Sequence, residues 1–185
     1  MRAKRLTIDE LPNETELDQL LVETLKAVTP LDERIRRLYD RPYCNRGWVQ
    51  VYTDGSCFNN GLPTAHAGAG VYFGPGNTKN AALRVPGPGQ TNNRGELYAI
   101  LESLRIVERH HGLEIYTDSK YAIEMITILA PAAATVDWDV PNGDVLRAIA
   151  EEIKSRPSPV TLKQVKGHSG NAHNDAADEL AKVGA

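Results

Sequence analysis

Four short stretches of this 185-residue chain each carry an acid where a strand or a helix is expected to begin or end. Asp54 lies in WVQVYTDGS (48–56), where alternating β-branched residues predict a strand that ends at the Asp-Gly pair. Glu96 lies in TNNRGEL, Asp118 in IYTDSKY and Asp178 in GHSGNAHNDAADELA. Taken singly, each acid has a structural explanation, as a turn residue, a capping-box member, a helix N-cap or a complement to a helix N-terminus.

Taken together, the four acids predict a metal site. Asp54 and Asp118 are expected at the carboxyl ends of strands, where ligand sites of α/β sheets form, with Glu96 and Asp178 in the first turns of helices. Clustered carboxylates repel one another unless cations bridge them. Hard oxygen ligands without Cys or His favour Mg²⁺, with Mn²⁺ as the expected substitute, and two such ions about 4 Å apart promote in-line displacement at phosphorus. His168, in the GHSG turn, is the candidate for moving protons or helping the product leave.

A mixed sheet flanked by helices is the predicted frame for these residues. We expect strands at 48–54, near 67–74, near 80–85, at 113–118 and at 160–166, helices at about 93–111, 119–129, 143–155 and 172–183, and a loop over 130–144. Asn93 with Glu96 matches a capping box for the first of these helices. The order predicts an antiparallel meander followed by parallel strands, which is an α/β fold.

Composition restricts the classes of function. The net charge is −3, so nucleic-acid binding would depend on a local patch or on metal ions. The two cysteines, Cys44 and Cys57, make no disulfide framework. The sequence contains neither a secretory signal nor an apolar run of membrane length. We therefore expect a protein of the cytoplasm or nucleus without a membrane partner.

Residues 1–47 are predicted to be a helical extension of a main domain that covers residues 48–185. Leucines and a valine recur at helical spacing over about 14–28, and a second short helix is expected before Pro42. Two short helices cannot bury their own apolar stripes. We expect them to pack on the main domain or on a protein partner.

At the acidic motifs the chain resembles type 1 ribonuclease H, which cuts the RNA strand of RNA–DNA hybrids. The motifs that carry the resemblance occur in the family's order and are YTDGS (52–56), TNNRGEL (91–97), YTDSKY (116–121) and VKGHSGNAHNDAADELA (165–181). The resemblance implies a ribonuclease H-like fold, with a five-stranded mixed sheet flanked by helices. It implies that Asp54, Glu96, Asp118 and Asp178 bind two Mg²⁺ ions, that His168 assists, and that the products carry 5′-phosphate and 3′-hydroxyl ends.

The resemblance also implies contacts with the RNA–DNA hybrid. Asn60, Asn92 and Asn93 match positions that read 2′-hydroxyl groups in the shallow minor groove. Thr91 and Asn142 match positions that hold a phosphate of the DNA strand. These five residues are the candidate nucleic-acid contacts.

Two departures from the family pattern predict weaker hybrid binding. The segment 120–166 contains six basic and six acidic residues, where many cellular members carry a basic helix and loop. Gly89 stands where eukaryotic members often have an arginine. The main hypothesis is a Mg²⁺-dependent endonuclease that acts on hybrids. One alternative is a non-catalytic hybrid-binding or protein-docking module on the same fold, and another is a domain derived from a retroelement's reverse transcriptase.

Overall fold

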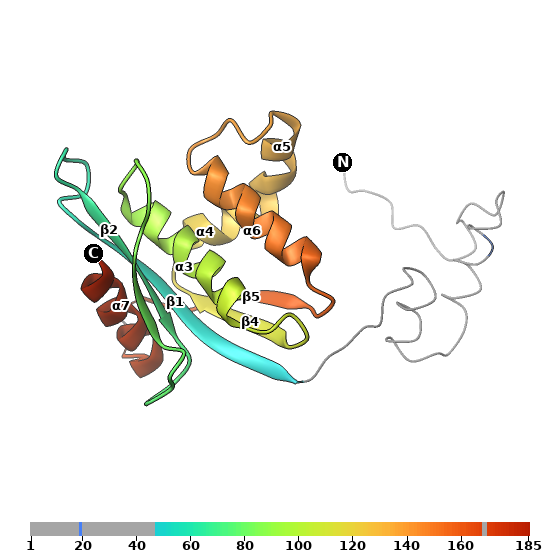
Figure 1. Ribbon diagram of the computed structural model, residues 1–185, viewed down its shortest axis with the longest axis horizontal. Helices are drawn as coiled ribbons and strands as arrows, with labels where there is room; N and C mark the ends of the chain where they lie inside the picture. Colours follow the sequence, from blue (N-terminus) through green and yellow to red (C-terminus); the bar gives the residue numbers. More distant parts are fainter. Residues whose placement is uncertain (1–18, 20–46, 168–169) are drawn as a thin grey trace. The chain divides into compact units, whose positions relative to one another are not determined.

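The computed structural model describes Gln19, residues 47–167 and residues 170–185 (Figure 1). A five-stranded sheet with the order β3-β2-β1-β4-β5 forms its centre. The strands are β1 (Trp48–Phe58), β2 (His66–Tyr72), β3 (Ala81–Arg84), β4 (Gly112–Thr117) and β5 (Val160–Gln164). β1, β2 and β3 pair antiparallel, whereas β4 and β5 run parallel to β1. This confirms the predicted mixed sheet.

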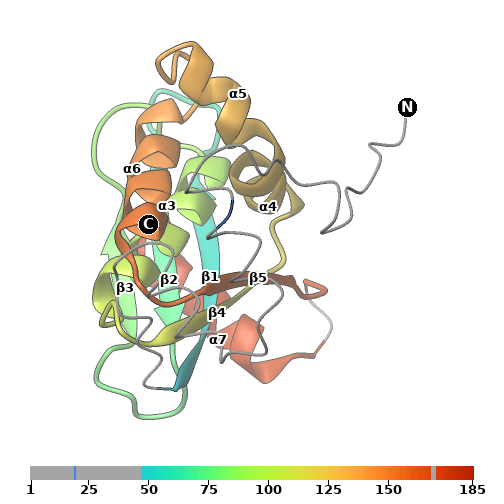
Figure 2. The ribbon, with the colours of Figure 1, turned by 90° about the vertical axis from the view of Figure 1, so that its right-hand side faces the viewer.

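Helices cover both faces of the sheet. α3 (Asn92–Ile106) and α6 (Gly143–Ser155) lie on one face, and α7 (Ala172–Gly184) lies on the other (Figures 1 and 2). Between β4 and α6 the chain forms α4 (Lys120–Glu124), the π-helical turn η2 (Met125–Leu129) and α5 (Ala130–Thr135). Within the described part of the chain, no helix has both the length and the apolar character needed to cross a membrane.

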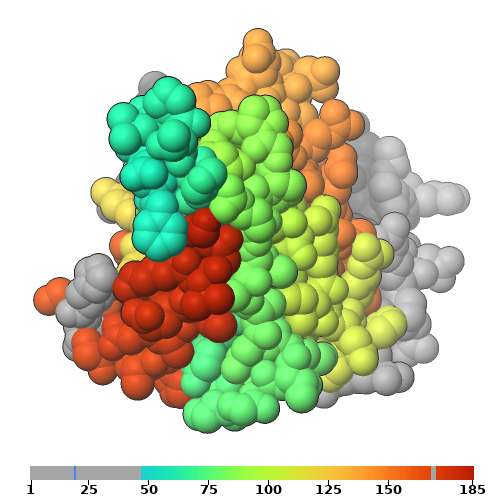
Figure 3. All heavy atoms as spheres, turned by 60° about the vertical axis from the view of Figure 1, so that its left-hand side comes forward, coloured from blue at the N-terminus to red at the C-terminus, as the bar shows by residue number. Residues whose placement is uncertain are grey.

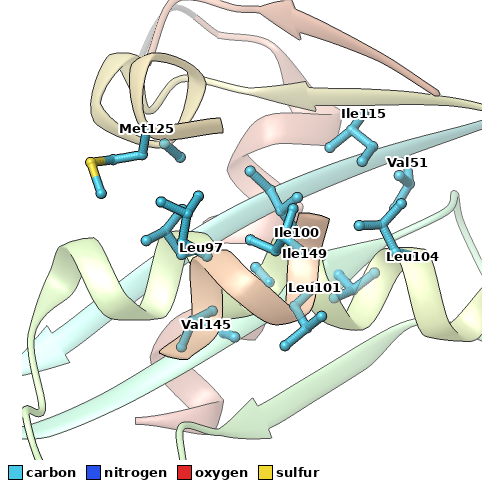
Figure 4. Close-up of a cluster of buried hydrophobic side chains, with 14 of the residues drawn as sticks. Val51, Leu97, Ile100, Leu101, Leu104, Ile115, Met125, Val145 and Ile149 are labelled. Carbon is cyan, nitrogen blue, oxygen red and sulfur yellow. The ribbon is translucent and has the colours of Figure 1, made fainter. Parts of the chain in front are cut away.

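The core lies between the sheet and α3. Leu97, Ile100 and Leu104 of α3 are fully or almost fully buried, and they meet Val51 of β1 and Ile115 of β4 (Figure 4). This is the face that the spacing of three and four residues predicts. Each such side chain contributes about 1.5–3 kcal/mol on burial, so the packing holds α3 firmly across the strands.

The other face of the sheet is built for close contact with α7. Gly68 and Gly70 of β2 lie directly under this helix, and a Cβ atom at either would overlap backbone atoms of α7, the carbonyl oxygens of Ala181 and Ala177 first. Figure 3 shows α7 pressed against the β2–β3 side of the molecule. The absence of side chains at these glycines therefore sets how close α7 comes to the strands.

Three local expectations are wrong. β1 does not end at Asp54 but continues to Phe58, because its antiparallel pairing with β2 extends from Tyr52 to Phe58. The N-cap of α3 is Thr91, whose side chain accepts from the backbone N–H of Arg94, so Asn93 and Glu96 do not form a capping box. Residues 130–135 are helical rather than part of a loop.

Other bounds differ by a few residues. α3 ends at Ile106, five residues before the expected end, and β4 begins at Gly112, which the sequence assigned to the stop of the helix. α6 spans the expected residues. The two helices expected within residues 1–47 lie outside the described residues and stay a prediction.

Candidate functional site

Asp54 and Asp118 lie where β1 and β4 separate. The parallel pairing of these strands ends at Tyr52 and Tyr116, whose rings stack with their centroids 4.7 Å apart. Asp54 follows two residues later in β1, and Asp118 comes directly after the last residue of β4. The point at which the parallel pairing stops thus brings both acids to one edge, although Asp54 lies inside β1 and not at its carboxyl end as the sequence predicts.

Glu96 reaches this edge because α3 crosses β1 at two glycines. A Cβ atom at Gly55 would overlap the backbone nitrogen of Glu96, and one at Gly95 would lie 2.6 Å from the carbonyl oxygen of Gly68. Neither position tolerates a side chain, so the helix backbone rests on the strand. Glu96, in the second turn of α3, is thereby placed beside the residue that follows Asp54.

Asp178 reaches the same place from the opposite face of the sheet. Gly70, against which α7 packs at Ala177, is the register partner of Asp54 in β2. Asp178 is the next residue of that helix. The four acids therefore come from two strands and two helices, and we call Asp54, Glu96, Asp118 and Asp178 the acid cluster.

The electrostatics of Asp54 reflect this gathering of charge. Its side chain is buried, with 8% of the residue exposed. Burial, followed by the charges of Asp118, Asp178 and Glu96, raises the pKa of Asp54 to about 7. The pKa of Glu96 is also raised, chiefly by burial and further by Asp118. Carboxylates that lie close together without enough neutralising charge repel one another. A divalent cation binds well at such a site because it relieves this repulsion.

The carboxylates take other partners in this conformation. Glu96 accepts hydrogen bonds from Asn92 Nδ2 at 2.9 Å and from Ser119 Oγ. Asp178 pairs with Lys182 Nζ at 2.6 Å, one helical turn away. Within residues 47–167 and 170–185, no three Asp, Glu, His or Cys side chains are arranged to hold a metal ion as they stand. The acids are neighbours, and their oxygen atoms point to the nearest donors.

The five candidate nucleic-acid contacts lie together in one hollow of about 630 Å³ beside the acid cluster. We call this hollow the amide hollow, and it is lined by Asn60, Pro88, Gly89, Thr91, Asn92, Asn93, Arg94, Tyr121, Pro141 and Asn142. The start of α3 supplies one wall and the start of α6 supplies another. These contacts come from segments that are far apart in the sequence, near residues 60, 91–93 and 142, and the fold brings them together.

Arg94 and Tyr121, which were not among the predicted contacts, also line the amide hollow. Tyr121 accepts a hydrogen bond from Asn142 Nδ2 at 3.0 Å, which draws the Asn142 side chain away from capping α6. Arg94 is buried and binds Asp144 through both terminal nitrogens, at 2.8 and 2.5 Å. Arg94 and Tyr121 are in the quoted motifs, but no local pattern indicates their partners.

Asp144 neutralises the positive charge that Arg94 brings to the wall of the amide hollow. The guanidinium group lowers the pKa of Asp144 through the hydrogen bonds they share, so both groups stay ionised near neutral pH. The polar lining of the hollow thus consists of amides, the hydroxyl groups of Thr91 and Tyr121, and Arg94, whose charge Asp144 neutralises. This agrees with the neutral segment that distinguishes the sequence.

His168 lies outside the described residues, and its proposed role stays a prediction. The described residues on either side of it are anchored. A Cβ atom at Gly167 would lie 2.5 Å from Asp118 Oδ2, so this glycine touches the acid cluster. Asn171 caps α7 by accepting from the backbone N–H groups of His173 and Asn174. The exposed His173 ring stacks on Tyr52, with a centroid distance of 5.1 Å.

Comparison with known proteins identifies the family. The family model described as RNase H matches residues 46–185. Human ribonuclease H1 is 36% identical over 144 residues, which are 75% of this chain and 50% of that protein. Ribonuclease H of Schizosaccharomyces pombe is 37% identical over 73% of this chain and 52% of its own length. The chain thus spans about half the length of these eukaryotic relatives.

A bacterial relative and a solved structure show the same likeness. Ribonuclease HI of Rickettsia prowazekii is 36% identical over 142 residues, which cover 74% of this chain and 90% of that protein. The crystal structure of LC9-RNase H1, a type 1 RNase H with the type 2 active-site motif, superposes with a TM-score of 0.57 at 27% identity. That match covers 74% of this chain and 71% of the other.

Proposed function

We propose that this chain, which belongs to the RNase H family, hydrolyses the RNA strand of RNA–DNA hybrids at the acid cluster. One observation carries the proposal. Four carboxylates from β1, α3, the end of β4 and α7 meet at one edge of the sheet, where burial, and after it the charges of the other three acids, raises the pKa of Asp54 to about 7. Such repulsion opposes folding, and a protein retains it where the charges have a use.

The acid cluster fits a pair of divalent ions. Ribonucleases H as a family depend on divalent metal ions. The cluster offers only carboxylate oxygens, which suit Mg²⁺ and also Mn²⁺. When bound, two Mg²⁺ ions would activate the attacking water and stabilise the leaving oxygen, so that the products carry 5′-phosphate and 3′-hydroxyl ends. Asp54, Glu96, Asp118 and Asp178 are the residues that would hold them.

The residues around the cluster prepare it for the ions. Asn92 and Ser119 orient the carboxylate of Glu96 before any ligand arrives. Asp54, with its pKa raised to about 7, carries a proton for part of the time near neutral pH, and a bound cation would favour its ionised form. His168 is assigned the transfer of protons or the departure of the product.

The amide hollow would bind the hybrid beside the cluster. Asn60, Asn92 and Asn93 supply amide groups that can both donate to and accept from ribose 2′-hydroxyl groups. Thr91 and Asn142 would hold a phosphate of the DNA strand. Because the charge of Arg94 is neutralised by Asp144, we expect affinity to depend on these polar groups and on the metal ions more than on cationic contacts.

A cleavage assay with labelled substrates tests the proposal. Wild-type protein and the Asp118→Asn variant are incubated with RNA–DNA hybrid, double-stranded RNA and double-stranded DNA, each with and without Mg²⁺. We expect metal-dependent cleavage of the hybrid alone and a loss of about a thousandfold in the variant, since metal activation supplies several kcal/mol of transition-state stabilisation.

The matched control is Glu108→Gln, which neutralises an exposed acid beyond the far end of α3. It should cleave as wild type does. Undiminished cleavage by Asp118→Asn would overturn the assignment of the site.

The alternative of a non-catalytic hybrid-binding or protein-docking module has two observations in its favour. Asp178 is occupied by Lys182, and no three of the described side chains form a ready metal site. That module would bind hybrid without nicking it at any Mg²⁺ or Mn²⁺ concentration. The same assay, combined with a gel-shift measurement on the hybrid, separates the two functions.

A further inference from the structure

Asn174 is a buried amide directly behind the acid cluster. It lies in the first turn of α7 with 2% of its surface exposed. Its Nδ2 atom donates a hydrogen bond to Asp118 Oδ2 at 3.2 Å. Its Oδ1 atom is also buried, and it has no hydrogen-bond partner among residues 47–167 and 170–185.

The orientation of this amide follows from its neighbour. The amide nitrogen is the donor of this side chain and the amide oxygen its acceptor, so the bond to Asp118 Oδ2 is made by the NH₂ group of Asn174. The carbonyl oxygen must then point away from that bond. Buried polar atoms nearly always have partners, and an unsatisfied one asks for a specific explanation.

The place of Asn174 on α7 supplies that explanation. It precedes Asp178 by four residues, and residues at this spacing lie on the same face of a helix. One turn of α7 therefore presents an amide and a carboxylate together to the end of β4. A bound Mg²⁺ usually keeps several of its waters, and such a water would supply the donor that the buried acceptor of Asn174 lacks.

We propose that Asn174 is a positioning residue for the metal site. Its Nδ2 group holds the carboxylate of Asp118, and its Oδ1 atom accepts a hydrogen bond from a water in the hydration shell of the bound cation. This rests on the proposed function, since it assumes that the acid cluster binds divalent ions. Partners of this kind orient the ligands, and their loss typically lowers metal affinity by about 10–100-fold.

A purely structural role for Asn174 predicts a different result. If the amide only ties α7 to β4, its removal lowers the stability of the fold and leaves the affinity for metal unchanged. Metal affinity therefore discriminates between the two roles, whereas a loss of stability or of activity alone does not.

The test measures Mn²⁺ binding to the free protein by isothermal titration calorimetry, and separately the Mg²⁺ concentration for half-maximal hybrid cleavage. The variants are Asn174→Ala and Asn174→Ser. Serine keeps a polar atom in the buried position, but its shorter side chain cannot reach Asp118. Two different variants are used so that the test is still possible if one of them fails to fold. We expect about tenfold weaker Mn²⁺ binding and about a tenfold higher Mg²⁺ requirement in both, with an unchanged KM for the hybrid at saturating Mg²⁺.

Asn80→Ala is the matched control. Asn80 is a partly buried amide in the β2–β3 turn that accepts from the backbone N–H of Phe73 and donates to the carbonyl of Gly74. Its loss should lower the melting temperature and leave metal binding as in wild type. Metal affinities of the folded Asn174 variants within about twofold of wild type would overturn the positioning role, because the loss expected is at least tenfold.

The two proposals can fail separately. If wild-type protein cleaves hybrid and the Asn174 variants bind Mn²⁺ normally, only the role of Asn174 is lost. If wild-type protein binds Mn²⁺ at the cluster but never cleaves hybrid, the proposed function is lost, and weaker Mn²⁺ binding in the variants still supports the role of Asn174.

Discussion

The acid cluster and the amide hollow lie side by side at the start of α3, and they are built on opposite electrostatic terms. The cluster gathers three carboxylates around a fourth, that of the buried Asp54, whose pKa is raised to about 7. The hollow contains one buried cation, Arg94, and neutralises it with Asp144. The acid cluster therefore holds like charges close together, whereas the amide hollow has little net charge.

Under the proposed function, this difference suits each region to a separate task. A site that must hold divalent ions gains from carboxylates that repel until the ions arrive, because binding then relieves the repulsion. A surface that reads sugar hydroxyls needs fixed amide groups and little net charge. We therefore expect changes in the cluster to alter metal binding, rate and pH dependence, and changes in the hollow to alter KM.

The largest effect on stability should come from pH in the absence of metal. Between about pH 4 and about pH 7 the folded state retains the proton of Asp54 that the unfolded state has released, so the free energy of unfolding falls as pH rises through this window. The fall is up to about 4 kcal/mol from this group alone, and it is complete above about pH 7. Urea unfolding in EDTA across this pH range measures it.

The Asp54→Asn variant makes this measurement specific. The amide of Asn cannot ionise, so the free energy of unfolding of the variant should change much less over the same pH range. It should exceed that of wild type in mildly alkaline buffer. The opposite result would be a wild-type free energy of unfolding that rises between about pH 4 and about pH 7 by about 4 kcal/mol. It would show that the acids do not repel one another.

In the hollow, Asn142→Ala should raise KM for the hybrid by about tenfold and leave kcat unchanged. The variant removes the hydrogen bond to Tyr121 and the phosphate contact proposed for Asn142, together worth roughly 1–1.5 kcal/mol. Steady-state kinetics at saturating Mg²⁺ check this expectation. Asn77→Ala, in the exposed β2–β3 turn, is the control. A fall in kcat without a change in KM would contradict the expectation that the amide hollow affects KM and the acid cluster affects the rate.

Tyr121→Phe should have a smaller effect in the same direction. It deletes only the acceptor of Asn142 and keeps the ring that lines the hollow, so KM should rise about threefold. The same kinetics measure it, and the double variant Tyr121→Phe with Asn142→Ala should be little worse than Asn142→Ala, because both changes break one hydrogen bond. Fully additive effects would mean that the two residues act independently.

The smallest effect is expected at the edge of the cluster, from Lys182→Gln. Lys182 competes with cations for Asp178, so its neutralisation should strengthen Mn²⁺ binding by about two- to threefold. Calorimetry detects this change. Lys79→Gln, which removes an exposed charge in the β2–β3 turn, should leave the affinity as it is. Weaker binding in Lys182→Gln would show that this lysine supports Asp178 instead of competing for it.

The sheet and the convergence of the acids were predictable from the sequence because both depend on regular signals. Alternation identified the strands, and the order of the motifs identified the family. The errors were local. Asp54-Gly55 has the composition of a turn, but pairing with β2 keeps it in the strand. Asn93 and Glu96 have the spacing of a capping box, but Thr91 caps α3 and Glu96 turns to Asn92 and Ser119.

What the sequence determined by itself is the set of four acids, their order and the α/β frame that collects them, since these follow from residue type and periodicity. Only the tertiary structure decided which partner each side chain takes: Lys182 for Asp178, Asp144 for Arg94, and Asn174 behind Asp118. Contacts of the last two kinds join residues that are 50 and 56 positions apart in the chain. They arise because glycines in β1, β2 and α3 let helices approach the strands closely, and no local pattern in the chain encodes how close that approach is.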